Sequence, residues 1–313
     1  MKNNHILVVS GEPRSIFLEI FFKALKHKKY RSPIILICNK NFLISYLKKT
    51  NFKKKIKVLE LQKLNEYKLN NNSINLIDIK LKKNNINQYI NESFELAFKL
   101  INNKLSYKLI NGPINKSSFL KRKFLGITEY VSHRFKVPNT GMLIYNKELS
   151  VVPLTTHLPL KMVSKKISKK ILKNKIELVH NFYKKHFKLS PKIAVTGLNP
   201  HCESILNYNE DVEIISPIIS SINKKKIDVK GPFSADTIFL KNIRKKFNVI
   251  IGMYHDQVLA PIKTLFEFDA INITMGLPFL RITPDHGPNE KMVGKNKSNP
   301  ISIINALNFL DKN

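Results

Sequence analysis

The sequence has no tryptophan and, in 313 residues, only two cysteines and ten glycines. Cys38 and Cys202 cannot form the disulfide framework of a secreted domain, and neither belongs to a CxxC pair. We therefore expect a reducing compartment. The cytoplasm is the default, because the N-terminus shows no signal-peptide pattern and no apolar run is long enough to span a membrane. The few glycines form no GxGxxG element, so the residues alone do not support a Rossmann dinucleotide site.

Acidic residues and arginine are scarce as well. The chain has 22 acidic against 54 basic residues, a formal charge of +32, and only six of the basic residues are arginine. Such a charge is typical of nucleic-acid-binding proteins. However, lysine is abundant together with asparagine and isoleucine, as AT-rich coding favours, and aromatic residues do not interleave with the lysines as a base-stacking platform requires. We predict neither a nucleic-acid partner nor a membrane partner.

Hydrophobic residues make up 43% of the chain, which is enough for a sizeable core. Apolar runs at 6–9 and 33–37 flank the breaker 11–13 and a helical pattern at 16–25. This order predicts a βαβ unit and therefore an α/β fold with a parallel sheet.

Further segments follow the same pattern. The stretch rich in lysine and asparagine from 48 to 88 contains two alternating runs, which predict peripheral strands at a solvated sheet edge. Apolar stripes predict three more helices, the last of them with Asn299 as its cap and Pro300 at its first position. The alternating runs are 56–61 and 74–81, the helices are 92–103, 164–187 and 301–310, and further apolar runs lie at 107–110, 142–145, 150–154, 192–195, 212–215 and 248–252.

Three of the nine histidines share one context. His157, His201 and His255 each lie just past the end of an apolar, strand-like run. Ligands of open α/β sheets bind outside the carboxyl ends of the strands. Three imidazoles at that edge would form a metal site with open positions for a substrate.

Charged and polar residues follow His255 closely. Asp256 is adjacent, Lys263 follows one short segment later, and Asn272 and Arg281 bracket the next apolar run. A carboxylate, an ammonium and a guanidinium near one strand end suit a small anionic substrate.

Two other segments have two interpretations each. Asp236, between serine and threonine neighbours, is either a helix cap or a site residue. The segment 112–116 is either a plain turn or an anion cradle with Lys116.

Taken together, the motifs resemble the 4-hydroxythreonine-4-phosphate dehydrogenase family of pyridoxal phosphate biosynthesis. The matching segments keep the order of the family and extend over most of the chain. They are 112–116 (GPINK), 126–129 (GITE), 155–159 (TTHLP), 197–201 (GLNPH), 231–236 (GPFSAD), 253–257 (MYHDQ), 272–278 (NITMGLP) and 285–287 (DHG).

The resemblance implies a two-lobed α/β/α fold of the isocitrate/isopropylmalate-dehydrogenase type with a cleft between the lobes. Residues 1–130 with 285–313 would form the first lobe, and residues 131–284 the second. It also implies a homodimer whose active site is completed by the partner subunit. His157, His201 and His255 would hold one divalent metal ion (zinc, magnesium or cobalt), and NAD would be the oxidant, bound without a GxGxxG element.

The implied substrate is a small phosphorylated amino acid, 4-phosphooxy-L-threonine. Thr128, Lys263, Asn272 and Arg281 match substrate-binding positions, and Lys263, Asp236 and Asp256 form the expected catalytic group. Oxidation would give 2-amino-3-oxo-4-phosphooxybutanoate, which decarboxylates to 3-amino-2-oxopropyl phosphate. The base remains open between Lys263 and a hydroxide on the metal.

The chain departs from the family at Ile127, where the family has a substrate-contacting histidine, because isoleucine can neither donate a hydrogen bond nor carry charge. Two other functions therefore stay open. One is a dehydrogenase for another phosphorylated hydroxy acid, such as a four-carbon sugar-acid phosphate. The other is an inactive basic scaffold that binds nucleic acid.

Overall fold

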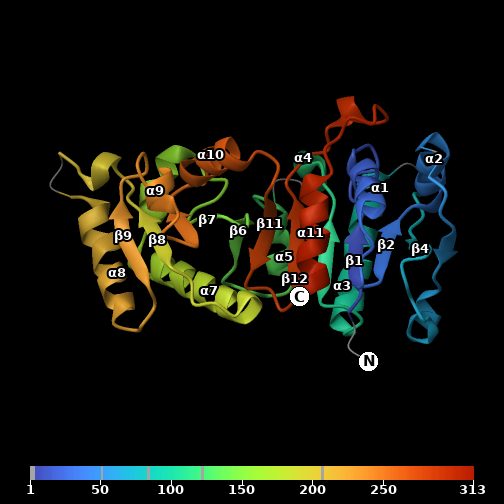
Figure 1. Cartoon of the computed structure of the whole chain (residues 1–313), viewed down its shortest axis with the longest axis horizontal. Coiled ribbons are helices and arrows are strands. Elements are labelled where there is room, and N and C mark those ends of the chain that lie inside the picture. Colours follow the sequence, from blue (N-terminus) through green and yellow to red (C-terminus); the bar gives the residue numbers. More distant parts are fainter. Residues whose placement is uncertain (1–3, 51, 83–84, 121–122, 206–207) are drawn as a thin grey trace. The chain divides into compact units, whose positions relative to one another are not determined.

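A computed structural model of the chain describes residues 4–50, 52–82, 85–120, 123–205 and 208–313. These residues fold into two α/β units, one from residues 1–124 with 278–313 and one from residues 125–277 (Figure 1). The mixed α/β class agrees with the prediction from the sequence. Among the described residues, no helix combines the length and the apolar character that crossing a membrane requires.

Among the described residues, the first unit contains six strands in the order β3-β4-β2-β1-β5-β12, and all neighbouring pairs are parallel. Its elements are β1 (Ile6–Val9), α1 (Phe17–His27), β2 (Ile34–Cys38), α2 (Lys40–Thr50), β3 (Ile56–Val58), the 3-10 helix η1 (Leu61–Glu66), β4 (Ile74–Asp78), α3 (Ile86–Asn102), β5 (Lys108–Asn111), α4 (Lys116–Phe119), β12 (Leu280–Pro284), the 3-10 helix η5 (Glu290–Met292) and α11 (Ile301–Lys312).

The predicted βαβ unit is confirmed as β1, α1 and β2. Both strands are buried along their whole length, because helices cover both faces of a parallel sheet. The predicted solvated edge is only partly correct. The edge strand β3 is partly exposed, whereas four of the five residues of β4 are buried because β4 lies between β3 and β2.

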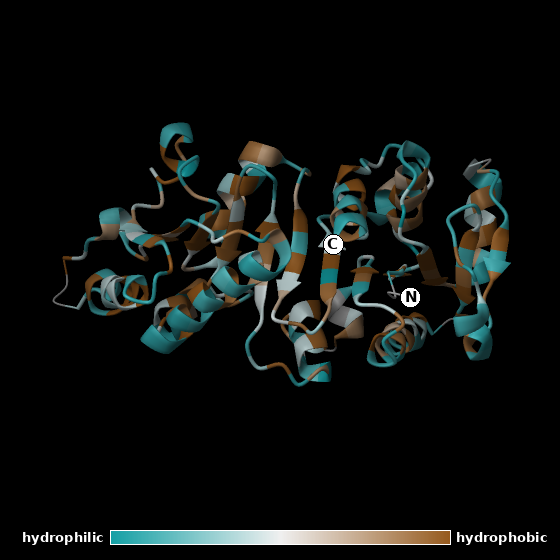
Figure 2. Cartoon of the chain, turned by 60° about the horizontal axis from the view of Figure 1, so that its bottom comes forward, coloured by the Kyte–Doolittle hydropathy of each residue, from teal (hydrophilic) through white to brown (hydrophobic). Residues whose placement is uncertain are grey.

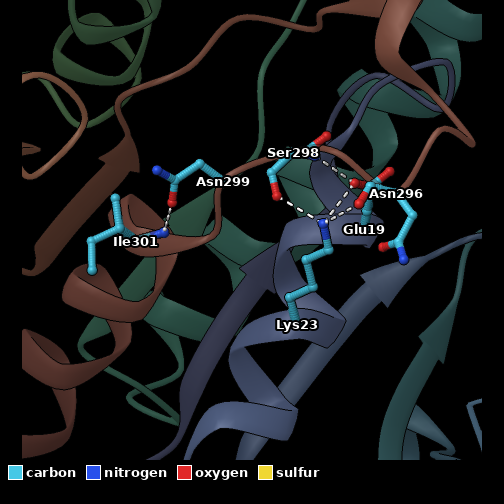
Figure 3. Close-up of polar contacts among 6 residues, drawn as sticks. All are labelled: Glu19, Lys23, Asn296, Ser298, Asn299 and Ile301. Carbon is cyan, nitrogen blue, oxygen red and sulfur yellow. Dashed lines mark hydrogen bonds and ion pairs between the residues drawn. The ribbon is translucent and has the colours of Figure 1, made fainter.

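Two helix starts of this unit differ from the prediction. Helix α3 begins six residues earlier than expected, because the side chain of Asn85 caps it by accepting a hydrogen bond from the Gln88 N–H. Helix α11 begins at Ile301 rather than at Pro300, which is its N-cap residue. The Asn299 side chain accepts from the Ile301 N–H at 2.9 Å, so Asn299 stabilises the helix start from the position before the N-cap residue and is not the N-cap itself (Figure 3).

In the part of the second unit that the structure describes, six strands follow the order β11-β6-β7-β10-β8-β9. Strands β7, β10, β8 and β9 are parallel, and β6 runs antiparallel to both β7 and β11. Its elements are α5 (Ile127–Arg134), β6 (Gly141–Tyr145), β7 (Ser150–Pro153), the 3-10 helix η2 (Leu160–Met162), α6 (Val163–Lys166), α7 (Lys169–Phe187), β8 (Ile193–Thr196), the 3-10 helix η3 (Pro200–Cys202), the π-helix η4 (Asp211–Ile215), α8 (Ser216–Asn223), β9 (Val229–Phe233), α9 (Lys241–Arg244), β10 (Val249–Gly252), α10 (His255–Phe266) and β11 (Ile271–Met275).

Two predictions for this unit are corrected. The expected helix 164–187 is divided into α6 and α7, because Ser168 adopts an extended conformation and its hydroxyl caps α7 at the Ile171 N–H. The apolar run 212–215 lies in the π-helix η4 and not in a strand. This short segment is interrupted by Glu213 and buried only at Ile215, so its apolar residues do not distinguish a strand from a turn of helix.

The core of the second unit joins helix α10 to the sheet. Val258 and Ile262 of α10 pack in one buried cluster with side chains of β6, β7, β8 and β10. Figure 2 agrees with this packing, because the strands are largely hydrophobic and the helices have a hydrophilic side. Packing therefore fixes the position of α10, which begins at His255.

A buried carboxylate in the first unit connects α1 with the segment that precedes α11 (Figure 3). Glu19 is 3% exposed, and its Oε1 accepts from the Ser298 N–H at 2.8 Å and from Lys23 Nζ at 3.0 Å. Lys23 also donates to the carbonyl oxygens of Asn296 and Ser298. Burial alone would raise the pKa of Glu19, but the hydrogen bonds from Ser298 and Lys23 outweigh burial and hold it below its ordinary value.

This carboxylate predicts a pH-dependent contribution to stability. A lowered pKa stabilises the fold above the ordinary glutamate value of about 4.3, and the contribution is lost as the pH falls through the lower, folded value. We expect Glu19→Gln to lower the free energy of unfolding by about 1–2 kcal/mol at neutral pH. In urea titrations, the difference from the wild type should shrink below about pH 4.

The control is Glu60→Gln, because Glu60 forms a similar pair with Lys63 at the exposed surface. Exposed pairs contribute less than about 1 kcal/mol. Equal losses for the two variants, or a pH-independent loss for Glu19→Gln, would contradict the role of the buried carboxylate.

Candidate active site

The four parallel strands of the second unit end at one edge of its sheet. Adjacent strands of that sheet, in the order β7, β10, β8 and β9, are followed by His157, His255, His201 and Asp236 respectively. Each of the three histidines thus follows the carboxyl end of a parallel strand, as the apolar runs predict. This edge is where open α/β sheets bind their ligands.

Two of the histidines are neighbours in space. The ring centroids of His157 and His255 lie 5.8 Å apart, with the ring planes at 37°. His255 is the first residue of α10, and its Nδ1 is 2.6 Å from Oδ1 of Asp256. The adjacent carboxylate can therefore fix the orientation and tautomer of the His255 ring, which leaves Nε2 for a ligand.

The backbone is strained at two of the three candidate histidines. His157 has a φ of 51° and His201 a φ of 55°, in the left-handed region that costs residues with a β-carbon about 1–2 kcal/mol each. Such conformations persist where the surrounding contacts determine them, and they cluster at functional sites.

A buried carboxylate anchors the loop that carries His201. Asp211 is 1% exposed and accepts from the N–H groups of Leu198 and Asn199 at 2.6 and 3.1 Å, and from the Asn199 side chain at 2.9 Å. Gly197 leaves the room for it, because a β-carbon there would lie 2.8 Å from Asp211 Oδ1. The start of the loop is therefore rigidly held, while His201 itself is exposed.

Gln257 connects the ends of β8 and β10. Its Oε1 accepts from the Met253 N–H and the Thr196 hydroxyl, both at 2.7 Å, and its Nε2 donates to the Gly197 carbonyl at 2.8 Å. Both polar atoms of this buried amide are thus hydrogen-bonded to the two strand ends. These bonds fix the loops of His201 and His255 relative to each other.

Asp236 is exposed and does not cap a helix. The next helix, α9, begins at Lys241 with Leu240 as its N-cap residue, so the interpretation of Asp236 as a helix cap is wrong. The Ser234 hydroxyl donates to Asp236 Oδ1 at 2.6 Å. This hydrogen bond, with the nearby His201, lowers the pKa of Asp236, so the side chain is an anion at neutral pH.

The donor set fits a divalent cation in its chemistry. Three imidazoles and a carboxylate come from four neighbouring strand ends, and His157 and His255 are already adjacent. Across the described ranges, however, no three histidine, cysteine, aspartate or glutamate side chains gather closely enough to form a metal site as they stand. His201 is the ligand candidate that is not brought to the other two.

The expected substrate-binding residues of this unit lie on three elements. Thr128 is in the first turn of α5, and Lys263 is on α10, where burial lowers the pKa of its ammonium group. Asn272, the second residue of β11, pairs with Ile144, which pairs with Val151 near the start of β7, so it lies toward the amino ends of these two strands rather than at the carboxyl edge. Its Oδ1 is buried and has no hydrogen-bond partner among the described residues.

Arg281 belongs to β12 of the first unit and is 1% exposed. Its Nε donates to Asn111 Oδ1 and its Nη2 to Thr283 Oγ1, both at 2.9 Å. These bonds hold the guanidinium against Asn111, the last residue of β5, which the segment 112–116 follows. In that segment the Gly112 N–H donates to the Val9 carbonyl, and the side chain of Lys116 lies outside the described part of the chain.

Some residues that shape this site carry no signal of their own in the sequence. Asp211 is in none of the motifs, and its role depends on a loop that only the fold brings to it. Gln257 and Glu129 belong to the motifs MYHDQ and GITE, so their positions, although not their roles, were identifiable.

Asp211 yields a direct test of the loop anchor. We expect Asp211→Ala to lower the free energy of unfolding by about 2–4 kcal/mol, because two backbone N–H groups lose their buried acceptor. Glu213→Ala is the matched control, since Glu213 lies on the same π-helix and is exposed. Urea titrations that give the same loss for both variants would rule out the anchor.

Comparisons with known proteins agree with this architecture. A family model described as pyridoxal phosphate biosynthetic protein PdxA matches residues 29–310. The 4-hydroxythreonine-4-phosphate dehydrogenase of Sulfurihydrogenibium sp. (strain YO3AOP1) is 34% identical over 312 residues, covering 96% of each chain. A crystal structure of a 4-hydroxythreonine-4-phosphate dehydrogenase from Burkholderia phymatum is similar with a TM-score of 0.79 and 25% identity, over 98% of this chain and 97% of that one.

A more distant neighbour defines the fold class. The β-decarboxylating dehydrogenase of Thermococcus kodakarensis is similar with a TM-score of 0.51 and 11% identity, over 97% of this chain and 81% of that one. At this identity the likeness concerns the fold alone, and it agrees with the predicted isocitrate/isopropylmalate-dehydrogenase type.

Proposed function

The chain belongs to the family of the pyridoxal phosphate biosynthetic protein PdxA, and we propose that it is a dehydrogenase that oxidises 4-phosphooxy-L-threonine with NAD. The observation that carries the proposal is the placement of His157, His255 and His201 at neighbouring parallel strand ends, with Asp236 at the fourth. The relatives that resemble the chain over nearly its full length are named for this dehydrogenase.

His157, His201 and His255 would hold one divalent cation, zinc, magnesium or cobalt. When bound, the cation would polarise the substrate hydroxyl and favour the later decarboxylation. The exposed position of His201 beyond the Asp211 anchor leaves its side chain room to join the other two. Asp236 and Asp256 supply negative charge beside the imidazoles.

The cofactor would take up the hydride, and a side chain would take up the proton. The hydroxyl proton of the substrate would pass to a base, and NAD, when bound, would take up the hydrogen on the same carbon as hydride, so that the alcohol becomes a ketone. The 3-oxo acid then loses carbon dioxide, and the carbon that keeps the electron pair takes up a proton to give 3-amino-2-oxopropyl phosphate. Lys263 is the side-chain candidate for the base, since burial lowers the pKa of its ammonium group.

Substrate anions would be bound by Thr128, Lys263 and Arg281. Asn272 Oδ1, buried without a partner in the described part of the chain, is an acceptor that a bound substrate could satisfy. The family resemblance further favours a homodimer with the active site completed by the partner subunit, in the cytoplasm.

The direct test is to supply the purified protein with NAD, 4-phosphooxy-L-threonine and cobalt, zinc or magnesium, and to follow NADH by its absorbance. We expect turnover that a chelator abolishes and that added metal restores. Absence of turnover with all three metals would overturn the proposed activity.

Ile127 is the observation that favours a second candidate substrate. It occupies the first position of α5 next to Thr128, where an isoleucine side chain makes no hydrogen bond to a substrate. A phosphorylated four-carbon hydroxy acid is therefore the alternative. The ratio of the kcat/KM values, measured with both substrates in competition, decides between them.

A further inference from the structure

The carboxylate of Glu129 is bound through only one of its oxygens. Glu129 lies in the first turn of α5, and its Oε1 accepts from the Thr156 hydroxyl at 3.3 Å. Its Oε2 is buried and has no hydrogen-bond partner within the described ranges. A buried carboxylate oxygen without a hydrogen-bond donor destabilises the fold, so another interaction must stabilise Glu129.

A buried lysine supplies the opposite charge. Lys175 of α7 is 9% exposed, and its Nζ donates to the Thr140 carbonyl at 2.8 Å. Burial lowers the pKa of Lys175 to about 8, and the negative charge of Glu129 acts against this decrease. At neutral pH the lysine is therefore still mainly a cation, and its charge attracts the Glu129 carboxylate.

The same contacts attach Lys175 to α5. The Thr140 hydroxyl lies 2.9 Å from the Ser132 hydroxyl, and Ser132 donates to the Thr128 carbonyl at 2.7 Å. These hydrogen bonds thus connect α7 to the first turn of α5, which carries Thr128 and Glu129. The contacts fix the first turn of α5, which is a short helix of eight residues.

The unpaired oxygen faces the same space as a candidate metal ligand. A β-carbon at Gly126 would lie 2.8 Å from Glu129 Oε2, 3.1 Å from His157 Cε1 and 3.3 Å from His157 Nδ1. The carboxylate and the imidazole therefore border one small volume, which only a glycine leaves free. Thr156, which donates to Glu129, directly precedes His157 in the chain.

We propose that Glu129 is a positioning residue: its carboxylate holds the Thr156–His157 turn and orients the His157 imidazole toward a divalent cation. The inference rests on the proposed function, and it explains how the left-handed backbone of His157 is maintained. A histidine that binds a metal commonly has a carboxylate behind it, and loss of that carboxylate weakens metal binding about 10–100-fold.

The experiment measures the affinity of the full chain for Co²⁺ by the visible absorption of the bound ion. We expect Glu129→Gln to bind Co²⁺ about 10–100-fold more weakly than the wild type. The control is Glu177→Gln on α7, whose carboxylate forms an exposed pair with Lys225, and it should bind as the wild type does. A merely structural role would reduce the fraction of protein that binds, and not its dissociation constant.

The outcomes separate this inference from the proposed function. If the wild type and Glu129→Gln bind Co²⁺ equally, the positioning role is wrong while the proposed function stands. If the wild type binds none of the three metals, the metal site is wrong and the positioning role falls with it. Should Glu129→Gln fail to fold, Thr156→Val removes only the hydroxyl that donates to Glu129, and unchanged affinity in that variant overturns the inference.

Discussion

Replacing His255 with alanine is expected to lower the turnover of the dehydrogenase about a thousandfold, equivalent to about 4 kcal/mol of transition-state stabilisation. The His255 ring lies beside that of His157, and both would bind the cation that polarises the substrate. The fold should survive, because α10 is held by Val258 and Ile262 in the core and not by its first residue. Steady-state NADH formation and the melting temperature check the two parts of this prediction.

The matched control is His27→Ala, since His27 is an exposed histidine at the end of α1 in the other unit. It should retain the turnover of the wild type. The double variant His157→Ala/His255→Ala should be no slower than either single variant, because residues that bind one ion act as a unit. Turnover of His255→Ala within tenfold of the wild type would refute the assignment of His255.

Replacing Arg281 with methionine is expected to impair both stability and catalysis. The free energy of unfolding should fall by about 2–4 kcal/mol, because Asn111 and Thr283 lose a buried hydrogen-bond partner. In addition, kcat/KM should fall about a hundredfold if the guanidinium binds a substrate anion in a bidentate manner. Urea titrations and steady-state kinetics measure the two effects separately.

Two further variants distinguish the two roles of Arg281. Arg281→Lys retains the charge but not the planar fork, so we expect it to recover only part of the lost kcat/KM. Arg31→Met removes an exposed arginine of the same unit and should change neither quantity by more than about 0.5 kcal/mol. A destabilised Arg281→Met variant with unchanged kcat/KM would restrict Arg281 to a structural role.

Local patterns accounted for much of the fold. Apolar runs of strand length between helical stripes predicted β1, β2, β5, β6, β7, β8 and β10, because a strand buried on both faces must be apolar at nearly every position. The same reasoning failed at 212–215, where the run lies in a π-helix that presents Asp211 to the loop before His201. Four residues are too few to show which period applies.

The sequence by itself determined that His157, His201 and His255 follow strand ends, because chain order and apolar patterning suffice to mark where a strand stops. It also placed the chain in its family through the order of its motifs. Only the tertiary structure decided that β7, β10, β8 and β9 are neighbours, and that Asn272 lies away from the carboxyl edge of the sheet. It alone brought Glu129 beside Thr156 and His157. Such contacts join separate segments of the chain, so they arise from packing and leave no period or spacing in the sequence.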